Sequence, residues 1–153
     1  MQPEKVTIQK KIIHGISVRT NNKDEQSQEN GKIPNLWKEF FEKDLINNIK
    51  NQKESSPIFG IYSSYESDFN GEYNLTIGKE VVSEDTTLKY KEVSIENGEY
   101  LLFKNKGQMP NIVINTWQNI WKYFEDNNIV RKYTTDFELY KSEDEIEIYI
   151  AVK

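Results

Sequence analysis

The chain has 153 residues, and its three Trp, nine Tyr and seven Phe supply enough apolar surface for a packed core, which excludes a disordered chain. Its 20 basic and 25 acidic side chains give a net charge of −5. An acidic chain lacks the attraction to phosphate on which nucleic-acid affinity depends, so we expect no direct nucleic-acid partner. Cysteine is absent and His14 is the single histidine, so we expect neither a metal site nor a cofactor.

The N-terminal residues, Met1 to Lys11, alternate in polarity and lack the apolar stretch of a signal peptide. No segment approaches the roughly 18 consecutive apolar residues that a membrane-spanning helix needs. We therefore expect a cytoplasmic protein without a membrane partner.

The first half of the chain predicts a strand, a helix and a hairpin. Residues Val6 to Val18 have the composition of a strand, with a bend or bulge at Gly15, and a polar loop follows. A helix is predicted from Pro34 to Gln52 because apolar residues recur there at helical spacing. These residues are Leu36, Trp37, Phe40, Phe41, Leu45 and Ile49. Two strands, Ile58 to Tyr65 and Glu72 to Val82, are predicted next, joined by a turn.

The same order returns after a linker at Ser83 to Thr87. Residues Tyr90 to Phe103 predict an interrupted strand, and Ile112 to Asn127 predict a second helix with its own apolar stripe. The chain then ends on a predicted hairpin. Its two strands are Thr135 to Tyr140 and Glu145 to Val152.

Three pairs of landmarks indicate that the two halves are copies of one unit. Gly15 and Gly98, Trp37 and Trp117, and Tyr62 and Tyr140 lie 83, 80 and 78 residues apart. We expect an α+β fold of two β-α-β-β repeats, about 4–82 and 88–153, in a single domain of residues 1–153. The repeats would be related by a pseudo-twofold axis, with a mainly antiparallel sheet, two main helices and a ligand cavity between them.

The last hairpin carries the candidate for chemistry. Side chains alternate between the two faces of a strand, so Glu138 and Tyr140 share one face while Phe137 and Leu139 share the other. On periodicity alone, the simplest interpretation of Glu138 is a solvated glutamate on the outer face of the sheet.

Six short segments, in the correct order along nearly the whole chain, resemble those of GyrI-like effector-binding domains. The most telling is TDFELY at residues 135–140, followed by IYIAV at 148–152. The others are FGIY at 59–62, GEY at 71–73, GEYLLF at 98–103 and the Trp-containing helix at 117–124.

That resemblance implies a stand-alone effector-binding domain without a DNA-binding domain, folded as two repeats around a pseudo-twofold axis. It also implies a cavity in which the glutamate of the last hairpin, here Glu138, faces the ligand. Tyr62, Tyr73 and Tyr140 would form the walls, and Trp117 is either a wall or a core residue. Four further aromatic residues are assigned to the core: Trp37, Trp121, Phe40 and Phe124.

The function expected from the resemblance is binding of a small aromatic or lipophilic ligand, cationic because the pocket holds a carboxylate. Two alternatives stay open. The first is a hydrolase that opens strained cyclopropane rings of DNA-alkylating compounds, in which Glu138 acts on water and Trp117 or Tyr140 holds the substrate. The second is a protein that interacts with gyrase or with a regulator.

Overall fold

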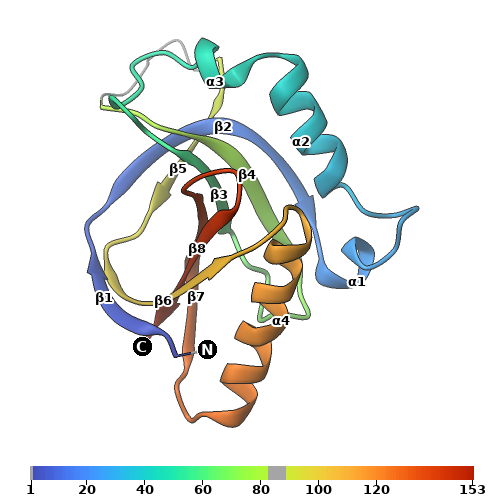
Figure 1. Cartoon of the computed structure of the whole chain (residues 1–153), viewed down its shortest axis with the longest axis vertical. Coiled ribbons are helices and arrows are strands. Elements are labelled where there is room, and N and C mark those ends of the chain that lie inside the picture. Colours follow the sequence, from blue (N-terminus) through green and yellow to red (C-terminus); the bar gives the residue numbers. More distant parts are fainter. Residues whose placement is uncertain (1, 83–88) are drawn as a thin grey trace.

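The computed structural model describes residues 2–82 and 89–153; the linker predicted at 83–87 lies outside the described residues. One antiparallel sheet of eight strands, in the order β1-β6-β8-β7-β3-β4-β2-β5, dominates the fold (Figure 1). The strands are β1 (Glu4–Ile8), β2 (Lys11–Thr20), β3 (Ile58–Ser63), β4 (Tyr73–Glu80), β5 (Lys91–Ile95), β6 (Gly98–Lys106), β7 (Arg131–Tyr140) and β8 (Glu145–Val152).

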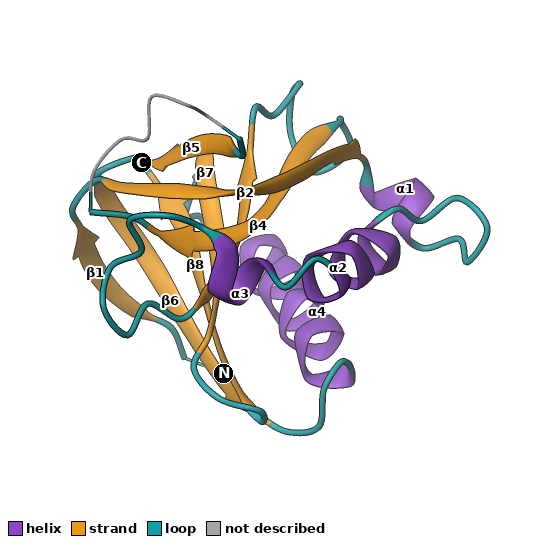
Figure 2. Ribbon diagram, turned by 90° about the horizontal axis from the view of Figure 1, so that it is seen from above, coloured by secondary structure: helices purple, strands orange, loops and turns teal. Residues whose placement is uncertain are grey.

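Two longer helices, α2 (Ile33–Glu42) and α4 (Asn111–Asp126), lie on the same side of the sheet (Figure 2). Two single-turn helices, α1 (Asn22–Glu25) and α3 (Leu45–Asn48), flank α2. Each long helix buries the apolar residues that recur four positions apart, because these lie on one helical face. They are Leu36 and Phe40 in α2, and Ile112 and Ile120 in α4, with Thr116 between them.

Helix α2 packs against β2 and β4, whereas α4 packs against β6 and β8. Figure 2 shows all four helices gathered on one side of the strands. The opposite face of the sheet curls around its own core (Figure 1), formed by Ile13, Phe59, Ile61, Ile95, Tyr100, Phe137 and Ala151. Both faces of the central strands β3 and β7 are therefore covered.

The strand order confirms the predicted pseudo-twofold arrangement. Each strand of the first half has a counterpart in the second half: β1 in β5, β2 in β6, β3 in β7 and β4 in β8. When every strand is exchanged for its counterpart, the same strand order results, read from the opposite edge of the sheet. The axis therefore passes between β3 and β7, which are the neighbours at the centre of the sheet. Each half has the order β-β-α-β-β, which is one strand more than the predicted unit. The extra strand arises because the segment predicted as the first strand forms two strands, β1 and β2. These two strands pair at opposite ends of the sheet.

Two further boundaries differ from the predictions. The first helix ends at Glu42 rather than at Gln52, because the backbone of Asp44 adopts a left-handed conformation with φ 50° before α3 begins. Gly15 lies within the β2–β4 ladder opposite Gly78, and a Cβ there would come within 1.9 Å of the carbonyl oxygen of Ile77. This glycine thus permits a close approach of two strands, and the predicted bulge is wrong.

Within residues 2–82 and 89–153, the longest helices are too short or too polar to span a bilayer.

Candidate functional site

Glu138 occupies the centre of the helix-covered face of the sheet. Its strand, β7, pairs with β3 on one side and β8 on the other, and Gly60 of β3 lies directly opposite it. A Cβ on Gly60 would lie 2.8 Å from Oε1 of Glu138, so the absence of a side chain there makes room for the carboxylate. The side chain is 2% exposed, which contradicts the interpretation of Glu138 as a solvated glutamate.

Three side chains donate hydrogen bonds to this carboxylate. The Tyr62 hydroxyl donates to Oε2 at 3.0 Å, the Trp117 indole N–H donates to Oε2 at 2.7 Å, and the Tyr140 hydroxyl donates to Oε1 at 2.8 Å. These donors come from β3, α4 and β7, so the sheet and one helix position the group together. In the part of the chain that the structure describes, no lysine or arginine forms an ion pair with Glu138.

The pKa of Glu138 is raised above its ordinary value of 4.5 because burial disfavours the charged form. The three hydrogen bonds act in the opposite direction, since a donor stabilises the ionised carboxylate. Burial and the neighbouring carboxylate also raise the pKa values of Tyr62 and Tyr140 well above 10.0. The two hydroxyls therefore stay protonated and remain donors.

The donor side chains are part of a larger aromatic group. Tyr73 packs against Tyr62 with ring centroids 5.2 Å apart, and its pKa too is raised, mainly by burial. Trp117 meets Tyr62 edge-on at 5.1 Å, and Trp37 meets Tyr140 edge-on at 5.0 Å. The structure thus brings together all five residues expected at the site, which are Glu138, Tyr62, Tyr73, Tyr140 and Trp117.

Trp37 is the aromatic residue that the sequence assigned to the core instead of the site. It packs on Phe40 and Phe41, as a core residue of α2 would, but its ring also contacts Tyr140 beside the carboxylate. Its spacing of 80 residues from Trp117 was the signal that could have placed it at the site.

A second buried carboxylate, Asp136, lies two residues before Glu138 and on the same face of β7. Unlike Glu138, it has a cation: Arg131 binds Oδ2 at 2.7 Å. The Tyr65 hydroxyl donates to the same oxygen at 2.5 Å, and the Ala151 amide donates to Oδ1 at 2.8 Å. Among the described residues, Asp136 thus has a cationic partner and Glu138 has none.

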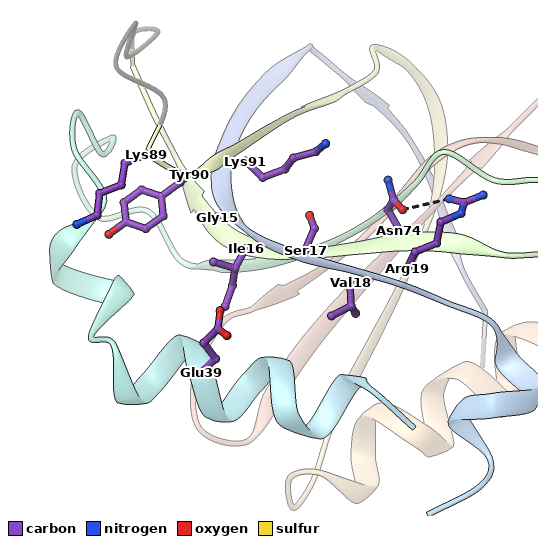
Figure 3. A pocket seen from close by; sticks show the side chains of 10 residues that line it. All are labelled: Gly15, Ile16, Ser17, Val18, Arg19, Glu39, Asn74, Lys89, Tyr90 and Lys91. Carbon is purple, nitrogen blue, oxygen red and sulfur yellow. Dashed lines mark hydrogen bonds between the residues drawn. The ribbon is translucent and has the colours of Figure 1, made fainter. Parts of the chain in front are cut away.

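An open groove of about 440 Å³ lies elsewhere, along β2 and beside α2 (Figure 3). Its lining includes Arg19, Lys89 and Lys91 and shares no residue with the aromatic group around Glu138. The groove is lined by charged side chains of both signs, Glu39 among them, and holds none of the residues expected at the site, so we place the candidate site at Glu138.

Comparison with known proteins identifies the family and the fold. Residues 6–152 match the family described as Cass2, integron-associated effector binding protein. The crystal structure of an integron cassette protein from the mobile metagenome of Vibrio cholerae superposes with a TM-score of 0.85 at 34% identity, covering 99% of this chain and 96% of that one.

Two further relatives are more distant. The structure of SAV2435 bound to tetraphenylphosphonium has a TM-score of 0.81 at 19% identity, covering 100% of this chain and 94% of that one, and it shows a shared fold. The Bacillus subtilis (strain 168) protein YobU, whose name describes a candidate transcriptional regulator, is 29% identical over 147 residues. That match covers 91% of this chain and 90% of the relative.

Proposed function

The chain belongs to the Cass2 family of integron-associated effector-binding proteins, and from this premise we propose that it binds a lipophilic organic cation against the carboxylate of Glu138. The family match confirms the resemblance of its sequence to GyrI-like effector-binding domains. It also supports binding of a small molecule, since the family is described as one of effector-binding proteins. The observation that carries the finer proposal is the contrast between two carboxylates on one strand. Asp136 is paired with Arg131, whereas Glu138 has donors but no cation.

The ligand is cationic because burial without a counter-ion is costly. A carboxylate that is 2% exposed loses most of its hydration, and hydrogen bonds alone compensate only part of that loss. A ligand cation compensates the remainder while it lies beside the ionised group. The raised pKa of Glu138 reflects this uncompensated burial.

The ligand is lipophilic and carries aromatic groups because the walls are aromatic rings. A diffuse organic cation is easier to desolvate than an ammonium ion, and its charge is attracted by the faces of Tyr and Trp. Tyr62, Tyr140, Trp37 and Trp117 are half-buried around the carboxylate, so rings of a ligand have partners on several sides. Tetraphenylphosphonium, bound in the structure of SAV2435, has this chemistry.

Binding requires that side chains move, because the carboxylate is enclosed in the structure described here. The three donors are aromatic side chains on β3, β7 and α4. We expect their rings to rotate when the ligand enters, because rotation of a ring displaces less of the structure than movement of a strand would. Asp136 is already paired with Arg131, so Glu138 is the carboxylate that is left for the cation.

The geometry favours binding over hydrolysis. A general base needs a lone pair directed at the water it activates. Here three hydrogen bonds already hold the carboxylate, which leaves room for one further partner on Oε1 and none for both a water and a substrate, and each of these bonds stabilises the ionised form. We therefore assign Glu138 a binding role.

Isothermal titration with tetraphenylphosphonium tests the proposal, with tetraphenylborate as the control of matched shape and opposite charge. We expect saturable binding of the cation and no binding of the anion, because the anion would meet an uncompensated carboxylate. Equal affinities for the two ions, or no binding of the cation, would contradict the proposal. Native mass spectrometry of freshly purified protein is an independent check, since a retained ligand would reveal its own mass.

A further inference from the structure

The rings around Glu138 form two matched pairs. Tyr62 and Tyr140 occupy equivalent positions on β3 and β7, 78 residues apart, and Trp37 and Trp117 lie on the equivalent helices α2 and α4. The Trp37–Tyr140 pair has a centroid distance of 5.0 Å and an interplanar angle of 77°; the Trp117–Tyr62 pair has 5.1 Å and 72°. Each contact therefore joins the helix of one half to the central strand of the other half, and the two contacts are of the same edge-on type.

The two pairs differ in the hydrogen bonds that they donate to the carboxylate. Trp117 donates to Oε2, which also accepts from Tyr62, whereas Oε1 accepts from Tyr140 alone among the described residues. Each oxygen of an ionised carboxylate can accept about two hydrogen bonds. The unused capacity is therefore on Oε1, the oxygen bonded by Tyr140, whose ring in turn contacts Trp37.

The Trp37 side also leads to the protein surface through aromatic rings. Trp37 stacks on Phe41 with centroids 5.9 Å apart and an interplanar angle of 23°. Phe41 is 54% exposed, so its ring reaches the protein surface. A continuous series of ring contacts thus joins solvent, Phe41, Trp37 and Tyr140.

We propose that the positive centre of the ligand lies on the Oε1 side of Glu138, with one of its aryl groups against Trp37. Trp117 is then a positioning residue: its N–H holds the carboxylate in place and keeps Oε2 occupied. The two matched tryptophans consequently have different roles, one toward the ligand and one toward the glutamate. This inference rests on the proposed function, because it specifies how the cation lies in that site.

Two substitutions separate the roles. Trp37→Leu keeps an apolar side chain on α2 but removes the aromatic face, so the affinity for tetraphenylphosphonium should fall roughly tenfold. The pH at which that affinity reaches half its maximal value should not change, because Trp37 donates no hydrogen bond to Glu138 in the described structure.

Trp117→Phe keeps a ring but removes the donor to Oε2. Loss of this hydrogen bond raises the pKa of Glu138 further, so the half-maximal affinity should move to higher pH. Three titratable groups around Glu138, the hydroxyls of Tyr62, Tyr73 and Tyr140, have pKa values raised above 10.0, so they stay protonated while Glu138 titrates.

Trp121→Leu is the matched control, since Trp121 packs on Trp117 with centroids 6.2 Å apart and makes no hydrogen bond to Glu138 in the described structure. It should bind the cation as the unmodified protein does. If Trp37→Leu also binds normally while the unmodified protein binds the cation, the inference is wrong and the proposed function stands. If the unmodified protein does not bind the cation, the proposed function itself fails.

A second measurement covers the case in which Trp37→Leu does not fold. In the double variant Trp117→Phe with Trp121→Phe, Trp37 is the single remaining tryptophan. Its fluorescence should change saturably on addition of tetraphenylphosphonium. Unchanged emission under conditions in which calorimetry shows binding would overturn the inference.

Discussion

Glu138→Gln is the substitution that tests the site most directly. Glutamine keeps the shape of the side chain and one oxygen that can accept from Tyr62 and Trp117, but it removes the charge. We compare tetraphenylphosphonium with triphenylphosphine oxide, a neutral molecule with the same kind of aryl groups. Both ligands stack on the same rings, so most of the apolar and stacking contributions cancel in the comparison.

The expected magnitude follows from the burial of the carboxylate. Interactions with a charged group in a site of this kind are worth about 1.5–3 kcal/mol, and Glu138 is 2% exposed, so solvent screens the charge little. At about 1.4 kcal/mol per factor of ten, the cation should lose roughly tenfold to hundredfold in affinity. The neutral analogue should lose much less.

The pH dependence has a definite sign. The pKa of Glu138 is raised above 4.5 in the folded protein, so part of the population carries a neutral carboxyl group as the pH falls through the raised value. The affinity for the cation should therefore rise with pH through that value and level off above it. Because the bound cation favours the ionised form, binding near that pH should release a proton.

Calorimetry measures all of these quantities. Titration of both ligands into both proteins gives the differential loss, and titration in two buffers of different ionisation enthalpy detects the released proton. Equal losses for the cation and the neutral analogue would refute the electrostatic argument, because Glu138 would then only shape the pocket. A pH-independent affinity in the unmodified protein would refute it as well.

Three further predictions concern the carboxylate and its surroundings. Glu138→Gln should also flatten the dependence of stability on pH: an acid whose pKa is raised by folding destabilises the folded state as pH rises above 4.5, and urea unfolding at several pH values measures this loss. Gly60→Ala should reduce the free energy of unfolding by about 1–3 kcal/mol and weaken cation binding, because the new Cβ would lie 2.8 Å from Oε1; normal binding and stability would mean that the carboxylate has spare room. Arg131→Met should cost about 3–5 kcal/mol in urea unfolding, since it leaves Asp136 buried without its cation, and a cost below 1 kcal/mol would show that water or a rearrangement compensates that charge.

The fold could be predicted from the sequence because its landmarks recur at nearly constant spacing. Pairs of glycine, tryptophan and tyrosine residues that lie 83, 80 and 78 residues apart indicated two copies of one unit. The strand order of the sheet has the twofold symmetry that two such copies would give. The strand boundary between β1 and β2 was not predictable from composition. Residues on both sides of it have strand character, and pairing with β6 or β4 decides where each strand belongs.

The position of Glu138 shows the limit of periodicity. Alternation correctly placed Glu138 and Tyr140 on one face of β7, but it could not tell whether solvent or helices cover that face. The answer depends on β7 being central in the sheet and on α2 and α4 lying over it. Here the resemblance to a known family supplied what the alternation could not.

Asp136 and Trp37 were missed for related reasons. The counter-ion of Asp136 is five residues earlier, across an irregularity of the β7–β8 pairing between Arg131 and Asp136, where simple alternation no longer applies. Trp37 lies within a continuous apolar stripe of α2, and no local pattern distinguishes the ring that faces Tyr140 from those that face the core. Both depend on contacts between distant or irregular segments.

The pairing of Gly60 with Glu138 has a consequence for stoichiometry. These two residues are 78 residues apart, as Tyr62 and Tyr140 are, so they occupy corresponding positions in the two halves and meet at the axis that relates them. A glutamate in both places would press two anions together at a point where a Cβ on Gly60 alone would already lie 2.8 Å from Oε1 of Glu138. The duplicated architecture therefore provides one anionic centre instead of two, and titration of this protein should saturate at one cation per chain.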